Sequence, residues 1–127
     1  MTKNKKTLLI VDDDSALLTA LESKFKKEGF NVFTARDGEE GLALALSQHP
    51  DMTLLDIIMP KMDGITMLKK LREDKWGQEA PVILLTNIDD NTRVADAVFS
   101  GAFDYLVKSD WKIDDVLVKV KQRLRMV

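Results

Sequence analysis

Five short apolar runs recur along the 127-residue chain, and their spacing constrains the fold more than any other feature of the sequence. The runs are Leu8–Val11, Asn31–Ala35, Met52–Leu55, Val82–Thr86 and Phe103–Val107. Their first residues lie 21 to 30 positions apart, which suits strand–helix units rather than hairpins. The first, third and fourth runs are almost wholly apolar, as expected for parallel strands covered on both faces. The second and fifth runs are more polar, which predicts that they form the sheet edges.

Between the runs, the apolar period changes to that of amphipathic helices. The helical stripes are Leu17 to Phe25, Leu42 to Leu46, Ile65 to Leu71, Val94 to Val98 and Ile113 to Leu124. Candidate N-caps precede four of them: Asp14 or Ser15, Asp37, Asp63, and Asp89 or Asp90. The prediction is an α/β fold, a (βα)5 doubly wound five-stranded parallel sheet in the flavodoxin-like order 2-1-3-4-5, with helices on both faces.

Composition excludes several functional classes. Nineteen basic against 21 acidic residues give a net charge of -2, which lacks the basic bias of a nucleic-acid-binding domain. Cysteine is absent, so the chain has no disulfide framework and no thiolate metal site. The first apolar run is too short for a secretory signal, and no segment approaches the roughly 20 apolar residues of a membrane span. We expect a cytoplasmic protein with no direct contact to nucleic acid or membrane.

Chemically useful residues stand where the predicted strands end. Asp12 and Asp13 follow the first run, Asp56 follows the third, Thr86 ends the fourth, and Lys108 follows the fifth. Ligands of doubly wound sheets bind beyond the carboxyl ends of the strands. We therefore expect three carboxylates, a hydroxyl and an ammonium group to meet at one end of the sheet.

Each of these groups has a use in phosphoryl transfer. Clustered carboxylates repel one another, and a divalent cation with a preference for oxygen ligands, Mg²⁺ above all, relieves that repulsion. A carboxylate can also act as a nucleophile and form an aspartyl phosphate. Lys108 and Thr86 would stabilise the charge of the attached group and hydrogen-bond it. The second run ends in Ala35 and Arg36, which add no obvious chemistry.

At these positions the chain resembles the receiver (CheY-like) domain of two-component response regulators. The matching pieces are Leu8-Leu9-Ile10-Val11-Asp12-Asp13-Asp14, Leu54-Leu55-Asp56 through Met62-Asp63-Gly64, Leu84-Leu85-Thr86 and Tyr105-Leu106-Val107-Lys108. The resemblance implies a receiver domain over residues 7–125, preceded by a basic N-terminal tail over residues 1–6.

The resemblance also implies roles for individual residues. Asp56 is the expected phosphoacceptor. Asp13 and Asp56 would bind Mg²⁺ directly together with the backbone carbonyl of Ile58, and Asp12 would assist through water. Thr86 and Lys108 would contact the phosphoryl group. Thr86 and Tyr105 would form the switch pair.

By the same resemblance, the chain would be a phosphoprotein of phosphorelay signal transduction. A histidine kinase or phosphotransfer protein would supply the phosphoryl group, and the domain would catalyse only its own phosphorylation and dephosphorylation. Output to another protein or domain would pass through the fourth helix, the fifth strand and the last helix. A phosphorylation-dependent homodimer is left open.

Two departures and two alternatives accompany this interpretation. Ser109 stands where the family usually has proline, and Asn87 where it usually has alanine or glycine. A metal-dependent phosphatase of the haloacid dehalogenase type is the main alternative, because Asp12-x-Asp14 resembles its opening motif. A flavin or nucleotide binder is less favoured, since aspartates stand where a glycine-rich phosphate loop would be needed.

Overall fold

All strands of the single sheet run parallel, in the order β2-β1-β3-β4-β5. The computed structural model describes residues 5–86, 101, 104–107 and 112–126. The strands are β1 (Thr7–Val11), β2 (Asn31–Ala35), β3 (Met52–Asp56), β4 (Val82–Thr86) and β5 (Asp104–Val107). The more polar strands β2 and β5 lie at the two edges, as their sequences predict.

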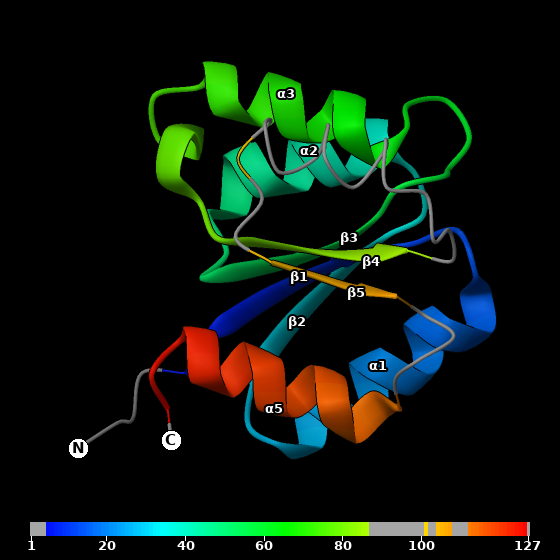
Figure 1. Ribbon diagram of the computed structural model, residues 1–127, viewed down its shortest axis with the longest axis vertical. Helices are drawn as coiled ribbons and strands as arrows, with labels where there is room; N and C mark the ends of the chain where they lie inside the picture. The colour runs from blue at the N-terminus through cyan, green and yellow to red at the C-terminus, as the bar shows by residue number, and fades with distance from the viewer. Residues whose placement is uncertain (1–4, 87–100, 102–103, 108–111, 127) are drawn as a thin grey trace.

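Helices cover both faces of the sheet. They are α1 (Ser15–Lys27), α2 (Gly38–Gln48), α3 (Gly64–Glu73), the short 3₁₀ helix η1 (Gly77–Glu79) and α5 (Ile113–Arg123). Figure 1 shows three layers, with α2 and α3 on one side of the sheet and α1 and α5 on the other. The predicted flavodoxin-like α/β fold is confirmed. The helix expected around residues 94–98 and its candidate caps Asp89 and Asp90 lie outside the described residues, so the complete (βα)5 repeat stays a prediction.

Aspartates begin three of the helices by accepting hydrogen bonds from backbone N–H groups that have no partner inside the helix. Asp14 accepts from Ala16 and Leu17, Asp37 accepts from Glu40, and Asp63 accepts from Thr66. Each was a candidate cap in the sequence. Ser15, the other candidate for α1, is the first helical residue instead.

Alternating residues of the strands build two separate cores. Leu8 and Ile10 of β1 belong to the core beneath α1 and α5, whereas Leu9 and Val11 belong to the core beneath α2 and α3. All four are at most 1% exposed. Successive side chains of a strand point to opposite faces, and a sheet covered on both sides buries both sets. The almost continuous apolar runs follow from this arrangement.

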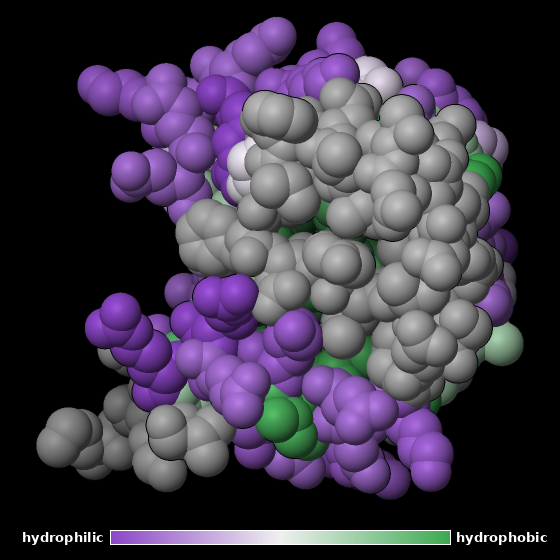
Figure 2. Space-filling model, in the orientation of Figure 1, coloured by the Kyte–Doolittle hydropathy of each residue, from purple (hydrophilic) through white to green (hydrophobic). Residues whose placement is uncertain are grey.

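On the face seen in Figure 2 the described surface is mostly hydrophilic, and hydrophobic residues show only in small areas. Within the described part of the chain, no helix combines the length and the apolar character needed to cross a membrane.

Candidate functional site

Three carboxylates meet at the carboxyl end of the sheet. One carboxylate oxygen from each of Asp12, Asp13 and Asp56 lies within 4.8 Å of the others. Asp12 and Asp56 are buried, with 0% and 6% of their surface exposed, whereas Asp13 is exposed. We call these three residues the acidic cluster. The structure thus brings together the aspartates that the sequence singled out.

The strand register explains why residues so distant in sequence become neighbours. Val11 is paired with Leu55 in the parallel β1–β3 ladder, so Asp12 and Asp56 are the next residues along two adjacent strands. Parallel strands end at the same edge of a sheet, and at this edge Asp12 and Asp56 flank the point between β1 and β3 where the strand order reverses. The acidic cluster therefore occupies the predicted crevice position.

Backbone N–H groups fix the segment of residues 12–14, which we call the first arm of the acidic cluster. The Asp12 N–H donates to the Ala35 carbonyl at 3.0 Å, and the Asp14 N–H donates to Asp12 Oδ1 at 2.9 Å. Asp14 itself is occupied as the cap of α1. The Asp12-x-Asp14 spacing that suggested a phosphatase thus combines a member of the cluster with a helix cap.

The second arm is the loop of residues 57–63 that follows Asp56. Ile57 and Met59 are buried, but Ile58 between them is 51% exposed. The Gly64 N–H donates to the Ile57 carbonyl at 2.7 Å and closes the base of the loop. A Cβ on Gly64 would lie 2.0 Å from the Asp56 carbonyl oxygen, so α3 begins directly against the backbone of Asp56.

The remaining site residues are described only in part. Thr86 ends β4 one residue beyond Leu85, which is the ladder partner of Asp56. Tyr105 lies in β5 opposite Leu84 of β4. Lys108, like Asn87 and Ser109, lies outside the described residues. The predicted contacts of Lys108, Thr86 and Tyr105 with a phosphoryl group therefore stay predictions.

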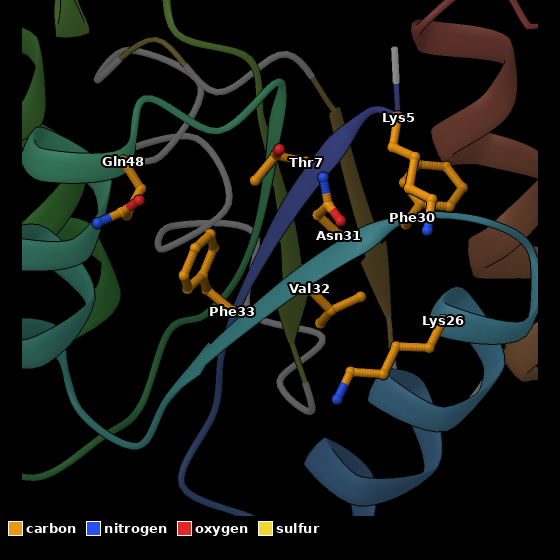
Figure 3. Close-up of a pocket in the computed structure, with 8 residues that line it drawn as sticks. All are labelled: Lys5, Thr7, Lys26, Phe30, Asn31, Val32, Phe33 and Gln48. Atoms are coloured by element: carbon orange, nitrogen blue, oxygen red, sulfur yellow. The ribbon is translucent and has the colours of Figure 1, made fainter. Parts of the chain in front are cut away.

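A groove at the opposite end of the sheet carries none of the predicted chemistry. Figure 3 shows its lining residues, which are Lys5, Thr7, Lys26, Phe30, Asn31, Val32, Phe33 and Gln48. They come from the start of β1, from the segment entering β2 and its first residues, and from the last turns of α1 and α2. Its lining residues include none of the acidic cluster.

Comparison with known proteins identifies the family. A family model described as the response regulator receiver domain matches residues 8–121, which is most of the chain. The chain belongs to this family. The receiver interpretation of the sequence is confirmed, and the comparison gives no support to the phosphatase alternative.

Curated relatives of this receiver domain are longer proteins. The response regulator PleD of Caulobacter vibrioides is 40% identical over 116 residues, which cover 91% of this chain and 25% of PleD. The alkaline phosphatase synthesis transcriptional regulatory protein PhoP of Bacillus subtilis is 38% identical over 122 residues, covering 96% of this chain and 49% of PhoP. The chain thus spans about a quarter to a half of the length of these relatives.

Solved structures share the whole fold of this receiver domain. A CheY-like receiver domain protein of Methanospirillum hungatei has a TM-score of 0.89 at 29% identity, covering 97% of this chain and 96% of that one. A CheX–CheY–BeF3–Mg+2 complex of Borrelia burgdorferi gives a TM-score of 0.84 at 35% identity, with 94% and 89% covered. Agreement over nearly full lengths supports the domain architecture described above.

Proposed function

We propose that this receiver domain takes a phosphoryl group onto Asp56 and signals through altered protein contacts. The observation that carries the proposal is the acidic cluster itself. Asp56 ends a buried central strand beside Asp12 and Asp13, at the sheet end where ligands of this fold bind. In the reaction, an Asp56 carboxylate oxygen forms a bond to phosphorus while the phosphorus–nitrogen bond of a phosphohistidine breaks. The electron pair of that bond stays on the imidazole.

Mg²⁺ is the proposed cofactor, and the residues of the acidic cluster fit it. Carboxylate oxygens are hard ligands, and three of them within 4.8 Å of one another match a cation that binds through one or two carboxylates plus water and phosphate oxygens. Asp13, Asp56 and the backbone carbonyl of Ile58 would hold the ion, with Asp12 assisting through water. When bound, the ion supplies positive charge to the transferring phosphoryl group. Mg²⁺ in the related CheY complex supports this assignment.

Further elements complete the proposal. Lys108 would pair with the phosphoryl group, Thr86 would hydrogen-bond it, and Tyr105 would follow Thr86 as the switch residue. The domain would span residues 7–125 after a basic tail, with a full (βα)5 repeat that places a helix between β4 and β5.

The proposed partners follow from the family. A histidine kinase or phosphotransfer protein in the cytoplasm would supply the phosphoryl group. The domain would promote only its own phosphorylation and dephosphorylation, without a turnover substrate. An output protein or domain would bind the surface of the fourth helix, β5 and α5, as the family resemblance implies. The related regulators carry additional sequence beyond the matched region, which supports an output domain.

Intact-mass spectrometry with acetyl phosphate tests the acceptor. The wild-type protein should gain one phosphoryl group in the presence of Mg²⁺ and little without it, and Asp56→Asn should gain none. Asp114→Asn is the matched control, because Asp114 is a strongly exposed carboxylate on α5, outside the acidic cluster. It should be labelled like the wild type. Undiminished labelling of Asp56→Asn would refute the assignment.

A further inference from the structure

The connection from β2 to α2 contributes no ligand to the proposed Mg²⁺ site, yet it contacts both arms of that site. We propose that this connection, residues 35–38, positions the two arms and that Gly38 is a positioning residue for the metal. The proposal rests on the proposed function of the acidic cluster and deepens it. The sequence had suggested that the end of β2 adds nothing to the chemistry.

The first contact holds Asp12. The carbonyl of Ala35, the last residue of β2, accepts the Asp12 N–H at 3.0 Å. Ala35 is fully buried and pairs with Val11 in the β1–β2 ladder, so this bond lies just beyond the last ladder pair. The side chain of Asp12 is in turn fixed by the Asp14 N–H at 2.9 Å. The backbone of Asp12 is therefore tied to β2 as the chain leaves the sheet.

The second contact holds the loop that carries Ile58. The Gly38 N–H, at the first residue of α2, donates to the Met62 carbonyl at 3.0 Å. Nearby, Lys61 Nζ lies 3.8 Å from Asp37 Oδ2. With Gly64 closing the base of the loop, the segment is held at two separate points. The place of the Ile58 carbonyl is thereby tied to α2.

Steric contact makes glycine necessary at position 38. A Cβ built there would lie 2.3 Å from the Met62 carbonyl oxygen and 2.9 Å from its carbonyl carbon. Ordinary van der Waals contact begins near 3.4 Å, so the loop would have to retreat by about 1 Å, the difference between 3.4 and 2.3 Å. Residues that orient metal ligands without touching the metal commonly change its affinity by roughly 10- to 100-fold when altered.

Gly38→Ala is the decisive variant, and Gly77→Ala is its matched control. A Cβ on Gly77 would lie 2.1 Å from the Leu71 carbonyl oxygen, which is an equally close backbone contact. Gly77 lies in η1, beyond the carboxyl end of α3, whereas the acidic cluster lies beside the start of that helix. Both variants should lose stability, and only Gly38→Ala should bind Mg²⁺ more weakly, by roughly tenfold or more, in isothermal titration calorimetry.

Amide hydrogen exchange of the wild-type protein gives a second readout, which decides the question if Gly38→Ala does not fold. Mg²⁺ should slow exchange of the Gly38 N–H more than exchange of the Gly41 N–H, which bonds to the Asp37 carbonyl within the same helix. Wild-type Mg²⁺ affinity in folded Gly38→Ala, or an equal Mg²⁺ effect on the two amides, would overturn the positioning role alone. A wild-type protein that binds no Mg²⁺ would overturn the proposed function together with it.

Discussion

The charged side chains at the two ends of the sheet have different surroundings. At the carboxyl end, Asp12, Asp13 and Asp56 crowd their carboxylates within 4.8 Å. At the amino end, the half-buried guanidinium of Arg72 donates to three carbonyl oxygens, those of Gly77, Ala80 and Gly101. Burial lowers the pKa of Arg72 from its ordinary value. The carboxyl end concentrates like charges, whereas at the amino end the charge of Arg72 is distributed over neutral acceptors.

We interpret this difference as one between the proposed functional end of the sheet and a structural end. Arg72 Nη1 lies 2.6 Å from the Gly77 oxygen and 2.8 Å from the Ala80 oxygen, so one side chain ties α3 to η1 and to the residues entering β4. Asp51 similarly accepts the Thr7 N–H at 2.7 Å where β1 begins. Polar groups at the amino end thus stabilise the fold. We expect the acidic cluster to cost stability in the absence of a bound cation, because like charges repel in a partly buried site.

The largest expected effect on stability is at the amino end. Arg72→Met should lower the free energy of unfolding by about 3 kcal/mol, because three carbonyl oxygens lose a charged donor. Arg72→Lys should recover little, since an ammonium group lacks the planar fork that reaches several acceptors. Urea denaturation measures the change, with exposed Lys70→Met on the same helix as control. If Arg72→Met loses no more free energy of unfolding than Lys70→Met, Arg72 does not stabilise the amino end of the sheet.

At the acidic cluster we expect a substitution to change the free energy of unfolding in the opposite direction. Without divalent cations, Asp13→Asn should raise the free energy of unfolding by about 1 kcal/mol, because one of three repelling charges is removed. The same variant should lose most of the stabilisation that saturating Mg²⁺ gives the wild type. Thermal denaturation with EDTA and with Mg²⁺ separates the two effects. A destabilised variant in EDTA contradicts the expected charge repulsion, and an unchanged Mg²⁺ effect contradicts the metal assignment.

A smaller effect concerns the lifetime of the phosphoryl group. Ile58 is half-exposed close to Asp56, the proposed acceptor, and its apolar side chain cannot orient an attacking water molecule. Ile58→Asn should shorten the lifetime several-fold, well short of the roughly hundredfold or more that a positioned general base contributes. The decay of phosphorylated protein, followed by intact mass, gives the rate, with Ile58→Val as control. Equal lifetimes for Ile58→Asn and wild type would contradict this explanation.

The smallest effect on stability is expected at an ion pair between α1 and α5, away from both ends of the sheet. Lys24 Nζ lies 3.0 Å from Asp114 Oδ1 across α1 and α5. The hydrogen bond and charge of Asp114 raise the pKa of Lys24 above its ordinary value. A raised pKa stabilises the fold below the unfolded-state pKa and loses that contribution as the pH rises through the folded-state value. The small difference in melting temperature between wild type and Asp114→Asn should therefore persist at neutral pH and vanish in strongly alkaline solution.

Sequence patterns predicted the fold and the acidic cluster because both depend on periodicity and strand order. Short apolar runs located the strands, and the topology then placed Asp12 beside Asp56 without any knowledge of side-chain contacts. Three N-caps were predictable for a similar reason, since an aspartate before an apolar stripe has one local use. Signals of this kind depend on residue type at a fixed place in a repeating pattern.

The contacts of Arg72 and Gly38 could not be predicted in the same way, because their partners are backbone atoms. Arg72 follows an ordinary helical stripe, and nothing in the sequence marks the three carbonyl groups that accept its hydrogen bonds. Gly38 follows a helix cap, and its need for a bare Cα arises from Met62, 24 positions away. His49 and Trp76 stack with ring centroids 4.1 Å apart, which no local pattern indicates. Such contacts follow from the assembled layers rather than from any single segment.

The alternation of β1 between the two cores has a consequence for signalling. Ile10 packs toward α1 and α5, and Val11, the residue before Asp12, packs toward α2 and α3. A displacement at the end of this strand therefore reaches both helical layers at once, because interiors packed this densely do not absorb it locally. We therefore expect a protein that binds the helices on either face of the sheet to sense the same displacement at the end of β1.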